Sequence, residues 1–184
     1  LHLSLRRQRQ MCIRDSASGG SGGSNHASGE FFKHTAGVQI THIPYKGNGP
    51  ALTDLLTNRV QMLFTGYAPV EMQVKSGQLR AIGVTGPRRL AALPDVPTMA
   101  ESGLNGYDFS TWYGVLAPAK TPRPVIDKLN ESLRQVMAAP EVKDKLASLG
   151  ADLTVSSPQA YGAMLQAEVA RWATLVKATG MSAE

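Results

Sequence analysis

The hydrophobic and polar positions of the chain predict helices and strands that alternate from residue 24 onward. Segments with apolar residues at helical spacing, most of them opened by serine, threonine or proline, are 24–36, 50–57, 69–76, 98–102, 121–138, 140–149 and a long stretch from 158. Short apolar or β-branched runs, which are typical of strands, are 38–43, 60–64, 81–85, 107–117 and 152–155. Strands that alternate with helices predict a mainly parallel α/β sheet with right-handed crossovers.

A glycine-rich turn stands immediately before the first predicted helix. Residues 18–24 read Ser-Gly-Gly-Ser-Gly-Gly-Ser, and we expect Ser24 to cap the helix and Gly37 to end it. A helix start leaves N–H groups without partners and is locally positive, and glycines let an anion reach the bare backbone. The run therefore fits a pocket for a carboxylate or a phosphate, although a flexible linker has the same composition.

A second turn, residues 45–50, contains further candidate groups. Tyr45 would form a wall of a pocket, and the N–H groups around Gly47 and Asn48 would face a ligand. Lys46 would offset negative charge, although we favour the interpretation of an exposed lysine in a tight turn. Ligands of parallel α/β sheets bind beyond the carboxyl ends of the strands, so both turns would lie at that edge if a strand precedes each of them.

Two more side chains are candidates for contact with a ligand, and each has an alternative structural role. His26 lies near the start of the first predicted helix, where it would either donate to a bound carboxylate or cap its own helix. Thr65 follows the strand expected at 60–64 and would either bond a ligand or cap the next helix.

Motifs for catalysis, metals and nucleotides are weak or absent. Residues 19–23 match the Gly-x-Ser-x-Gly nucleophile elbow, but residues 16 and 17 have no strand pattern. The histidines that follow have no aspartate before them and only Glu30 as an acid, so a hydrolase with the usual order of catalytic residues is excluded. His26, His34 and His42 follow one another at intervals of eight residues with no cysteine nearby, which predicts no metal site. No phosphate-binding or dinucleotide-binding motif is complete, so we expect no cofactor.

Charge and composition limit the partners of the chain. The 184 residues are 42% hydrophobic and 18% charged, as in globular proteins, and carry a net charge of +5. Residues 1–15 hold four arginines and one aspartate, so the charge without them is +2, which predicts no nucleic-acid partner. These residues lack helical and strand periodicity and the apolar segment of a signal peptide. We interpret them as a non-native leader of adapter or assembly sequence.

Several segments, taken in their order and spacing, resemble one known family. They are residues 18–26, 29–33, 42–56, 77–82, 93–103, 112–118 and 121–122. With these segments the chain, from about residue 16 to its C-terminus, resembles the substrate-binding proteins of tripartite tricarboxylate transporters, the Bug or TctC-like family. Gly23 departs from the family pattern, which often has serine or threonine at this place, and the departure removes one hydroxyl donor.

The resemblance implies an α/β, periplasmic-binding-protein-like (type II) architecture of two lobes, with the N-terminal part of the first lobe missing. Residues 16–110 would form the second lobe and residues 111–184 the return segment of the first lobe. Family members hold a carboxylate with backbone and hydroxyl donors from one loop in each lobe. The expected binding residues here are Ser18, Gly19, Gly20, Ser21, Gly22, Gly23, Ser24, His26, Tyr45, Lys46, Gly47 and Thr65.

The function that the resemblance implies is capture of a small mono-, di- or tricarboxylate in the periplasm. The protein would be a monomer, would deliver its ligand to the membrane permease subunits of a transporter, and would catalyse no reaction. Two alternatives stay open. One is a ligand-sensing domain of a transcription regulator, which a helix-turn-helix would support, and none is readable here. The other is an α/β enzyme, which would need an acid, a base and a nucleophile that the sequence does not provide.

Overall fold

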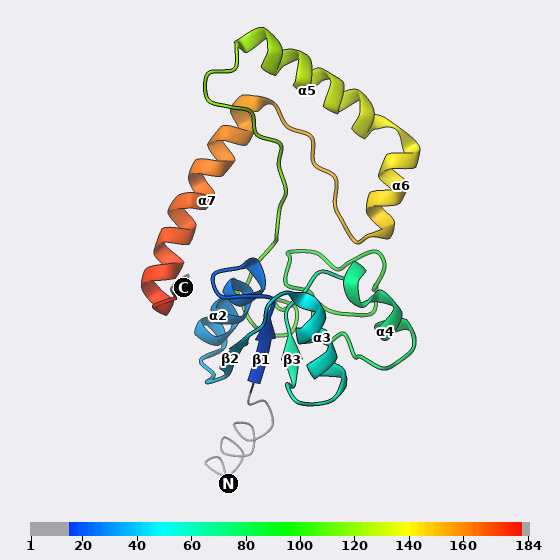
Figure 1. Cartoon of the computed structure of the whole chain (residues 1–184), viewed down its shortest axis with the longest axis vertical. Coiled ribbons are helices and arrows are strands. Elements are labelled where there is room, and N and C mark those ends of the chain that lie inside the picture. The colour runs from blue at the N-terminus through cyan, green and yellow to red at the C-terminus, as the bar shows by residue number, and fades with distance from the viewer. Residues whose placement is uncertain (1–14, 182–184) are drawn as a thin grey trace.

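The centre of the fold is a parallel sheet of three strands, seen in a computed structural model that describes residues 15–181. The strands are β1 (Asp15–Ser18), β2 (Thr41–Pro44) and β3 (Met62–Leu63), in the order β2-β1-β3 (Figure 1). In the register of the sheet, Ser16 lies opposite His42 on one side and Met62 on the other. The predicted parallel α/β sheet is confirmed.

The central strand β1 is the element that the sequence pattern missed. Residues 16 and 17 lie in the middle of this strand, although neither was expected to be extended. Asp15, which was assigned to the leader, is its first residue, and its carbonyl accepts a 3.2 Å hydrogen bond from Gln61 N–H. Serine, alanine and aspartate are weak strand formers, so the two neighbouring strands specify β1. The rest of the leader prediction, residues 1–14, lies outside the described residues.

Two helices cover opposite faces of the sheet. Helix α2 (Ser24–Ala36) shares a buried cluster with Phe64, and helix α3 (Asn48–Leu56) shares a separate one with Ala17. Because side chains alternate along a strand, the serines on either side of Ala17 face α2. At Gly29 of α2 an added Cβ would lie 3.5 Å from the Phe64 ring, an ordinary contact distance, so this face of the helix packs directly against Phe64.

Most of the predicted helices form within one or two residues of the expected bounds. Gly37 ends α2 in the left-handed conformation, and Ser157 caps the last helix by accepting from Ala160 N–H at 3.2 Å. The expectation that Ser24 caps α2 was wrong, because Gly23 occupies the N-cap position. The remaining elements are η1 (Ala68–Val70), α4 (Glu71–Lys75), α5 (Arg123–Ala138), α6 (Pro140–Ser148) and α7 (Pro158–Thr179).

Three predicted strands and one short helix do not form. Residues 81–85 make only an isolated bridge, between Val84 and Thr98, and residues 107–117 and 152–155 are irregular. A strand needs a partner for its backbone groups, and no described segment pairs with these residues as a ladder. Residues 98–102 form turns in place of a helix.

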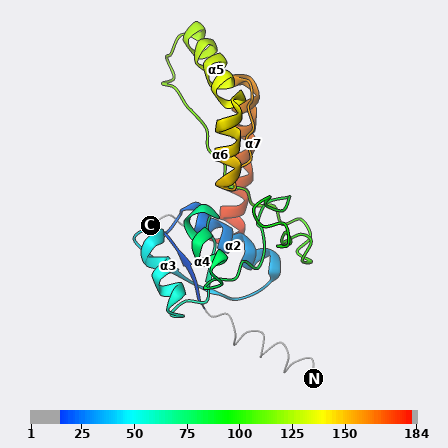
Figure 2. The same ribbon diagram turned by 90° about the vertical axis from the view of Figure 1, so that its right-hand side faces the viewer.

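The last third of the chain extends away from the sheet and then returns to it. Helices α5 and α6 lie at a distance from the strands, and α7 runs back until its C-terminal half packs on α2 (Figures 1 and 2). None of these three helices holds a buried residue. In the segment that leads to them, Tyr113 is 94% exposed and Leu116 is 71% exposed. The buried core is therefore confined to the sheet, the helices on its two faces and the loops that follow.

Candidate ligand-binding site

A cavity of about 260 Å³ opens where β1 ends and α2 begins. Its lining comes from the first glycine-rich turn, the first residues of α2 and the start of α3, and consists of Gly19, Gly20, Ser21, Gly23, Ser24, Asn25 and Asn48. The strand order is β2-β1-β3, so the chain goes from β1 to β2 on one side of it and then crosses over to β3 on the other side. The carboxyl end of the central strand is the place where such sheets bind ligands.

The turn needs glycine for two separate physical reasons. Gly22 has φ of 74°, a left-handed conformation that side chains other than glycine rarely adopt. At Gly19 the backbone comes so close to α3 that an added Cβ would collide with Asn48 Oδ1. The Gly/Ser run is therefore a folded turn with defined contacts.

The N-terminus of α2 faces this cavity without a side-chain cap. Gly23 holds the N-cap position, and no side-chain cap hydrogen bond is present at this helix start. The first turn contains no acidic residue either. The amide groups of a helix start and its partial positive charge then remain available to an anion, as in known phosphate and carboxylate sites.

Hydrogen bonds tie the first turn to the turn after β2. Tyr45 N–H donates to Ser18 O at 2.9 Å, and Gly47 N–H donates to Gly19 O at 3.0 Å. A side-chain bond of 2.9 Å runs from Asn25 Nδ2 to Asn48 Oδ1. The two turns thus form one unit, and both asparagines line the cavity. Asn48 was expected to face a ligand through its backbone N–H, and Asn25 was not named among the expected binding residues.

Two stacked histidines lie beneath the turn. The rings of His26 and His42 have centroids 3.8 Å apart and planes only 12° from parallel. His26 Nδ1 accepts from Gly22 N–H at 3.0 Å, and His42 Nε2 lies 2.6 Å from the hydroxyl of Ser18. Ser18 is fully buried, and its hydroxyl also contacts the N–H and the carbonyl of Gly20. The histidines therefore contact the turn from below.

Burial lowers the pKa of both histidines. For His26, desolvation is the largest cause, and the nearby Glu30 carboxylate opposes it. For His42, desolvation is again the largest cause of the lowered pKa, and the positive charge that His26 would carry is the second. Two stacked rings that both lose water favour the neutral imidazoles. The Nδ1 atom of His26 is then free of a proton and accepts from Gly22.

The predicted site residues separate into three groups. Five line the cavity: Gly19, Gly20, Ser21, Gly23 and Ser24. Three lie beside or beneath it within the network of the turn: Ser18, Gly22 and His26. The other four do not line it: Tyr45, Lys46, Gly47 and Thr65.

The four residues that do not line the cavity have other positions. The hydroxyl of Tyr45 donates to Asp54 at 2.9 Å, which raises the pKa of the tyrosine. Lys46 is exposed, and Thr65 is half-buried after β3. Gly47 takes part through its N–H bond to Gly19. Sequence reasoning also missed His42, whose neighbourhood depends on the register between β1 and β2.

A strand, β1, does precede residues 19–23, so the expectation that the Gly-x-Ser-x-Gly match has no strand before it was wrong. Among the described residues, the histidines near the turn contact Gly22 N–H and the Ser18 hydroxyl, and neither bonds to Ser21. In the described part of the chain, Ser21 therefore lacks the histidine partner that a Ser-His pair would need.

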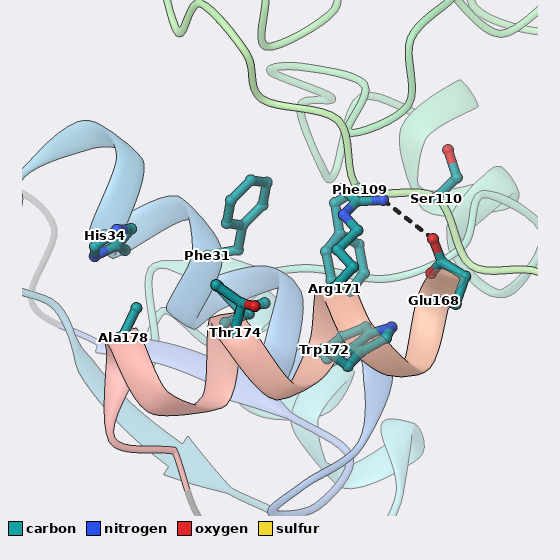
Figure 3. A pocket seen from close by; sticks show the side chains of 10 residues that line it. Phe31, His34, Phe109, Ser110, Glu168, Arg171, Trp172, Thr174 and Ala178 are labelled. Carbon is teal, nitrogen blue, oxygen red and sulfur yellow. Dashed lines mark hydrogen bonds and ion pairs between the residues drawn. The ribbon is translucent and has the colours of Figure 1, made fainter. Parts of the chain in front are cut away.

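A second cavity, of about 360 Å³, lies between α2 and α7 (Figure 3). Phe31, Phe109 and Trp172 give it a largely apolar wall. The one guanidinium at this cavity, that of Arg171, is 3.5 Å from the Glu168 carboxylate and also bonds to the Asp108 carbonyl. Its charge is already balanced, so this cavity is less suited to a small anion than the one above β1.

Residues 15–181 contain no cluster of three or more histidine, cysteine, aspartate or glutamate side chains placed to hold a metal ion. Over the same range, no helix has both the length and the apolar character needed to cross a membrane.

Comparison with known proteins gives consistent matches. The family model described as the tripartite tricarboxylate transporter family receptor matches residues 14–181. A UPF0065 protein of Pseudomonas sp. is 37% identical over 87% of this chain and 48% of its own length. BugT of Bordetella pertussis is 34% identical over 86% of this chain and 49% of its own length. The chain thus spans about half the length of these relatives.

Solved structures agree in fold. The R. palustris protein Rpa4515, solved with adipate, superimposes with a TM-score of 0.84 at 33% identity, over 98% of this chain and 60% of the other. The periplasmic binding protein BugD gives a TM-score of 0.83 at 34% identity, over 99% and 62%. MatC from Rhodopseudomonas palustris, with bound malate, gives 0.76 at 28% identity, over 95% and 60%. The chain has the fold of periplasmic binding proteins.

Proposed function

The chain belongs to the tripartite tricarboxylate transporter receptor family, and we propose that it forms the carboxylate-holding part of a solute-binding protein. The cavity at the N-terminus of α2 carries this proposal. It combines a helix start without a side-chain cap, a glycine turn that exposes backbone amides, and the hydroxyl groups of Ser21 and Ser24. These groups are donors for one small anionic group.

The chemistry of the lining favours a carboxylate over a more highly charged anion. The residues that line the cavity are glycines, serines and asparagines, all of them uncharged. Neutral donors suit the single charge of a carboxylate, whereas phosphate sites commonly add a lysine or an arginine. The related proteins solved with adipate and with malate support the same class, since both ligands are dicarboxylates.

We assign residues 16–110 to the second lobe of the binding protein and residues 111–184 to the segment that returns to the first. The exposure of the second region supports this division. Tyr113, Val115 and Leu116 are all more than two-thirds exposed, which is unusual for neighbouring large apolar residues. In the whole protein, the remainder of the first lobe would cover them.

The working cycle that follows is binding without chemistry. The two lobes would close on the carboxylate by a hinge motion and carry it through the periplasm to the permease subunits of the transporter. Family membership supports this role, and the similarity to BugD supports the periplasmic location. No step makes or breaks a covalent bond.

The test is an NMR titration of the ¹⁵N-labelled chain with adipate and with malate. We expect the amide signals of residues 19–25 and the side-chain amide of Asn48 to shift, and the same concentration of adipamide, which is neutral, to leave them in place. This titration detects weak binding, so it suits a chain that holds one half of a site. No shift with any carboxylate would refute the proposal.

A pair of glycine variants provides the matched control. Gly22 and Gly77 have φ of 74° and 75°, and both are exposed. Alanine strains the backbone equally at both places, but Gly77 follows α4, away from the cavity. We expect Gly22→Ala to weaken the response to adipate and Gly77→Ala to preserve it.

A further inference from the structure

His26 reaches backwards from α2 to hold the turn that precedes it. The residue is on the first turn of the helix and is 9% exposed, and its Nδ1 accepts from Gly22 N–H at 3.0 Å. Gly22 is the residue whose left-handed conformation redirects the chain into α2. The ring therefore fixes the peptide group between Ser21 and Gly22, just ahead of the N-cap Gly23.

The hydrogen bonds show which protonation state of the His26 ring can hold Gly22 N–H. Since Nδ1 accepts a hydrogen bond from Gly22 N–H, the neutral ring carries its proton on Nε2, which lies 3.6 Å from the Glu30 carboxylate. Lys33 holds that carboxylate with bonds of 2.8 and 2.9 Å. A second proton on His26 would have to bind Nδ1, and the acceptor for Gly22 would then be lost.

His42 completes the support from the neighbouring strand. The Ser18 hydroxyl lies 3.0 Å from Gly20 O, accepts from Gly20 N–H at 3.3 Å and shares a hydrogen bond of 2.6 Å with His42 Nε2. Its ring stacks on His26 and keeps it in place. Through these contacts, β1 and β2 both position the turn.

We propose that His26 is a positioning residue, which holds the glycine turn in its anion-binding form through Gly22 and releases it when Nδ1 is protonated. His42 supports the ring of His26 from the other face. The groups that face the pair are Glu30, which favours protonation, and Lys33 together with the second imidazole, which oppose it. Binding of a carboxylate should thus weaken in acid because His26 is protonated, and not only because the ligand is.

This role differs from direct contact with the ligand. His26 is not among the residues that line the cavity, and its Nδ1 is already occupied by Gly22. A contact residue would offer a donor to the anion, whereas His26 acts as an acceptor toward the backbone. Variants that keep or remove that acceptor distinguish the two roles.

Three variants test the proposal, which rests on the proposed function for its ligand-binding part. His26→Phe keeps an aromatic ring but has no acceptor. His26→Asn keeps an acceptor oxygen close to the position of Nδ1 and does not titrate. His34→Asn is the control, because His34 lies on the same helix, is exposed and does not line this cavity.

The first readout needs no ligand. We expect the protection of the Gly22 amide against hydrogen exchange, corrected for the intrinsic rate, to fall about tenfold in His26→Phe at pH 7.5. In the unsubstituted chain and in His34→Asn, the protection of the Gly22 amide should decrease as the pH is lowered from 7.5 to 5. In His26→Asn it should stay the same at both pH values. If His26→Phe does not fold, the flat pH response of His26→Asn still decides.

The second readout is adipate binding, measured from the changes in chemical shift of the amide signals of residues 19–25. We expect His26→Phe to bind about tenfold more weakly, and His26→Asn to bind as the unsubstituted chain does at pH 7.5. Equal binding by His26→Phe, or an acid response of His26→Asn equal to that of the unsubstituted chain, would overturn the positioning role. If no carboxylate binds the unsubstituted chain, the proposed function fails, whereas the exchange data still decide how His26 acts on Gly22.

Discussion

Asn25 donates a hydrogen bond of 2.9 Å from Nδ2 to Oδ1 of Asn48. Asn25 lies in the first turn of α2, which follows β1, and Asn48 is the first residue of α3, which follows β2. The bond therefore links the two connections that leave neighbouring strands, and both of its residues line the cavity. The positions of the two glycine turns are coupled through this pair.

A charge at Asn48 should weaken carboxylate binding without breaking this link. Asn48→Asp keeps the acceptor for Asn25 Nδ2 but puts a negative charge in the lining of the cavity. At a separation of about 4 Å, repulsion in a partly solvated site amounts to about 1–4 kcal/mol, so we expect adipate affinity to fall tenfold or more. NMR titration at low and high salt measures the effect, which salt should reduce.

The matched control for that variant is Gln39→Glu. It makes the same change of charge at an exposed residue that precedes β2, at the opposite end of the sheet from the cavity. We expect adipate binding to change less than twofold, as for exposed charges farther apart than the Debye length. An equal loss in both variants would mean that the overall charge of the chain is responsible, and not the position of Asn48.

Gly19→Ala should displace the Asn48 side chain. The new Cβ would collide with Asn48 Oδ1, so the amide has to rotate and its bond to Asn25 is lost. We expect a loss of about 1 kcal/mol in the free energy of unfolding, measured with urea. Gly49→Ala is the control, because a Cβ at Gly49 meets nothing within 4 Å and alanine favours the helix.

A double-mutant cycle checks the cause of that loss. In a chain that already carries Asn48→Ala, the side chain that obstructs residue 19 is gone. Gly19→Ala should then cost clearly less than in the unsubstituted chain. The same cost in both backgrounds would locate the strain in the backbone of the turn and contradict our explanation.

Local signals predicted the helices well, and long-range contacts account for what the sequence missed. Gly37 and Ser157 mark helix ends by their own conformational and hydrogen-bonding properties, so they are visible in a single segment. β1 is a strand only because β2 and β3 pair with it on both sides. The apolar run at 107–117 shows the reverse case, since it has a strand pattern but no described partner.

The candidate site was predicted in part for the same reason. The glycine turn is visible in the sequence because residue type alone indicates it. Asn25 and Asn48 are 23 positions apart and meet only when two parallel strands are in register. His42 could be assigned to the site only after Ser16 was known to lie beside it in the sheet.

The stability of the chain should fall in mild acid. Burial lowers the pKa of His26 and of His42 in the folded chain, whereas both return to about 6.5 on unfolding. Below that pH the unfolded chain binds more protons than the folded one, so the free energy of unfolding decreases as the pH falls toward the lowered values. The slope is at most about 1.4 kcal/mol per pH unit for each proton.

Urea unfolding at several pH values between 8 and 5 measures this dependence. We expect a plateau above pH 7 and a decline below 6.5, with a smaller decline in His26→Asn. His34→Asn should follow the unsubstituted chain. An unchanged decline in His26→Asn would attribute the acid response to other groups.

Tyr107→Phe should loosen the attachment of the segment after residue 106 to α2. Tyr107 is 1% exposed, and its hydroxyl donates to Ser28 O at 3.1 Å and lies 3.3 Å from the Ser28 hydroxyl. The variant leaves buried groups of Ser28 short of a partner, so we expect a loss of about 1–2 kcal/mol in unfolding experiments. Tyr113→Phe, at a residue 94% exposed, should change stability by less than about 0.5 kcal/mol.

The longer parent protein, expressed with its upstream coding sequence, should bind its carboxylate at least about a hundredfold more tightly than this chain. A hundredfold corresponds to about 2.7 kcal/mol, which two or three additional hydrogen bonds from the first lobe would supply. The cavity above β1 is open, so in this chain water competes for the donors of the turn. Calorimetry on the parent and NMR titration on the chain, with the same panel of carboxylates, give the two affinities. Comparable values would mean that the turn of residues 18–24 supplies nearly all of the binding free energy and that the first lobe adds little.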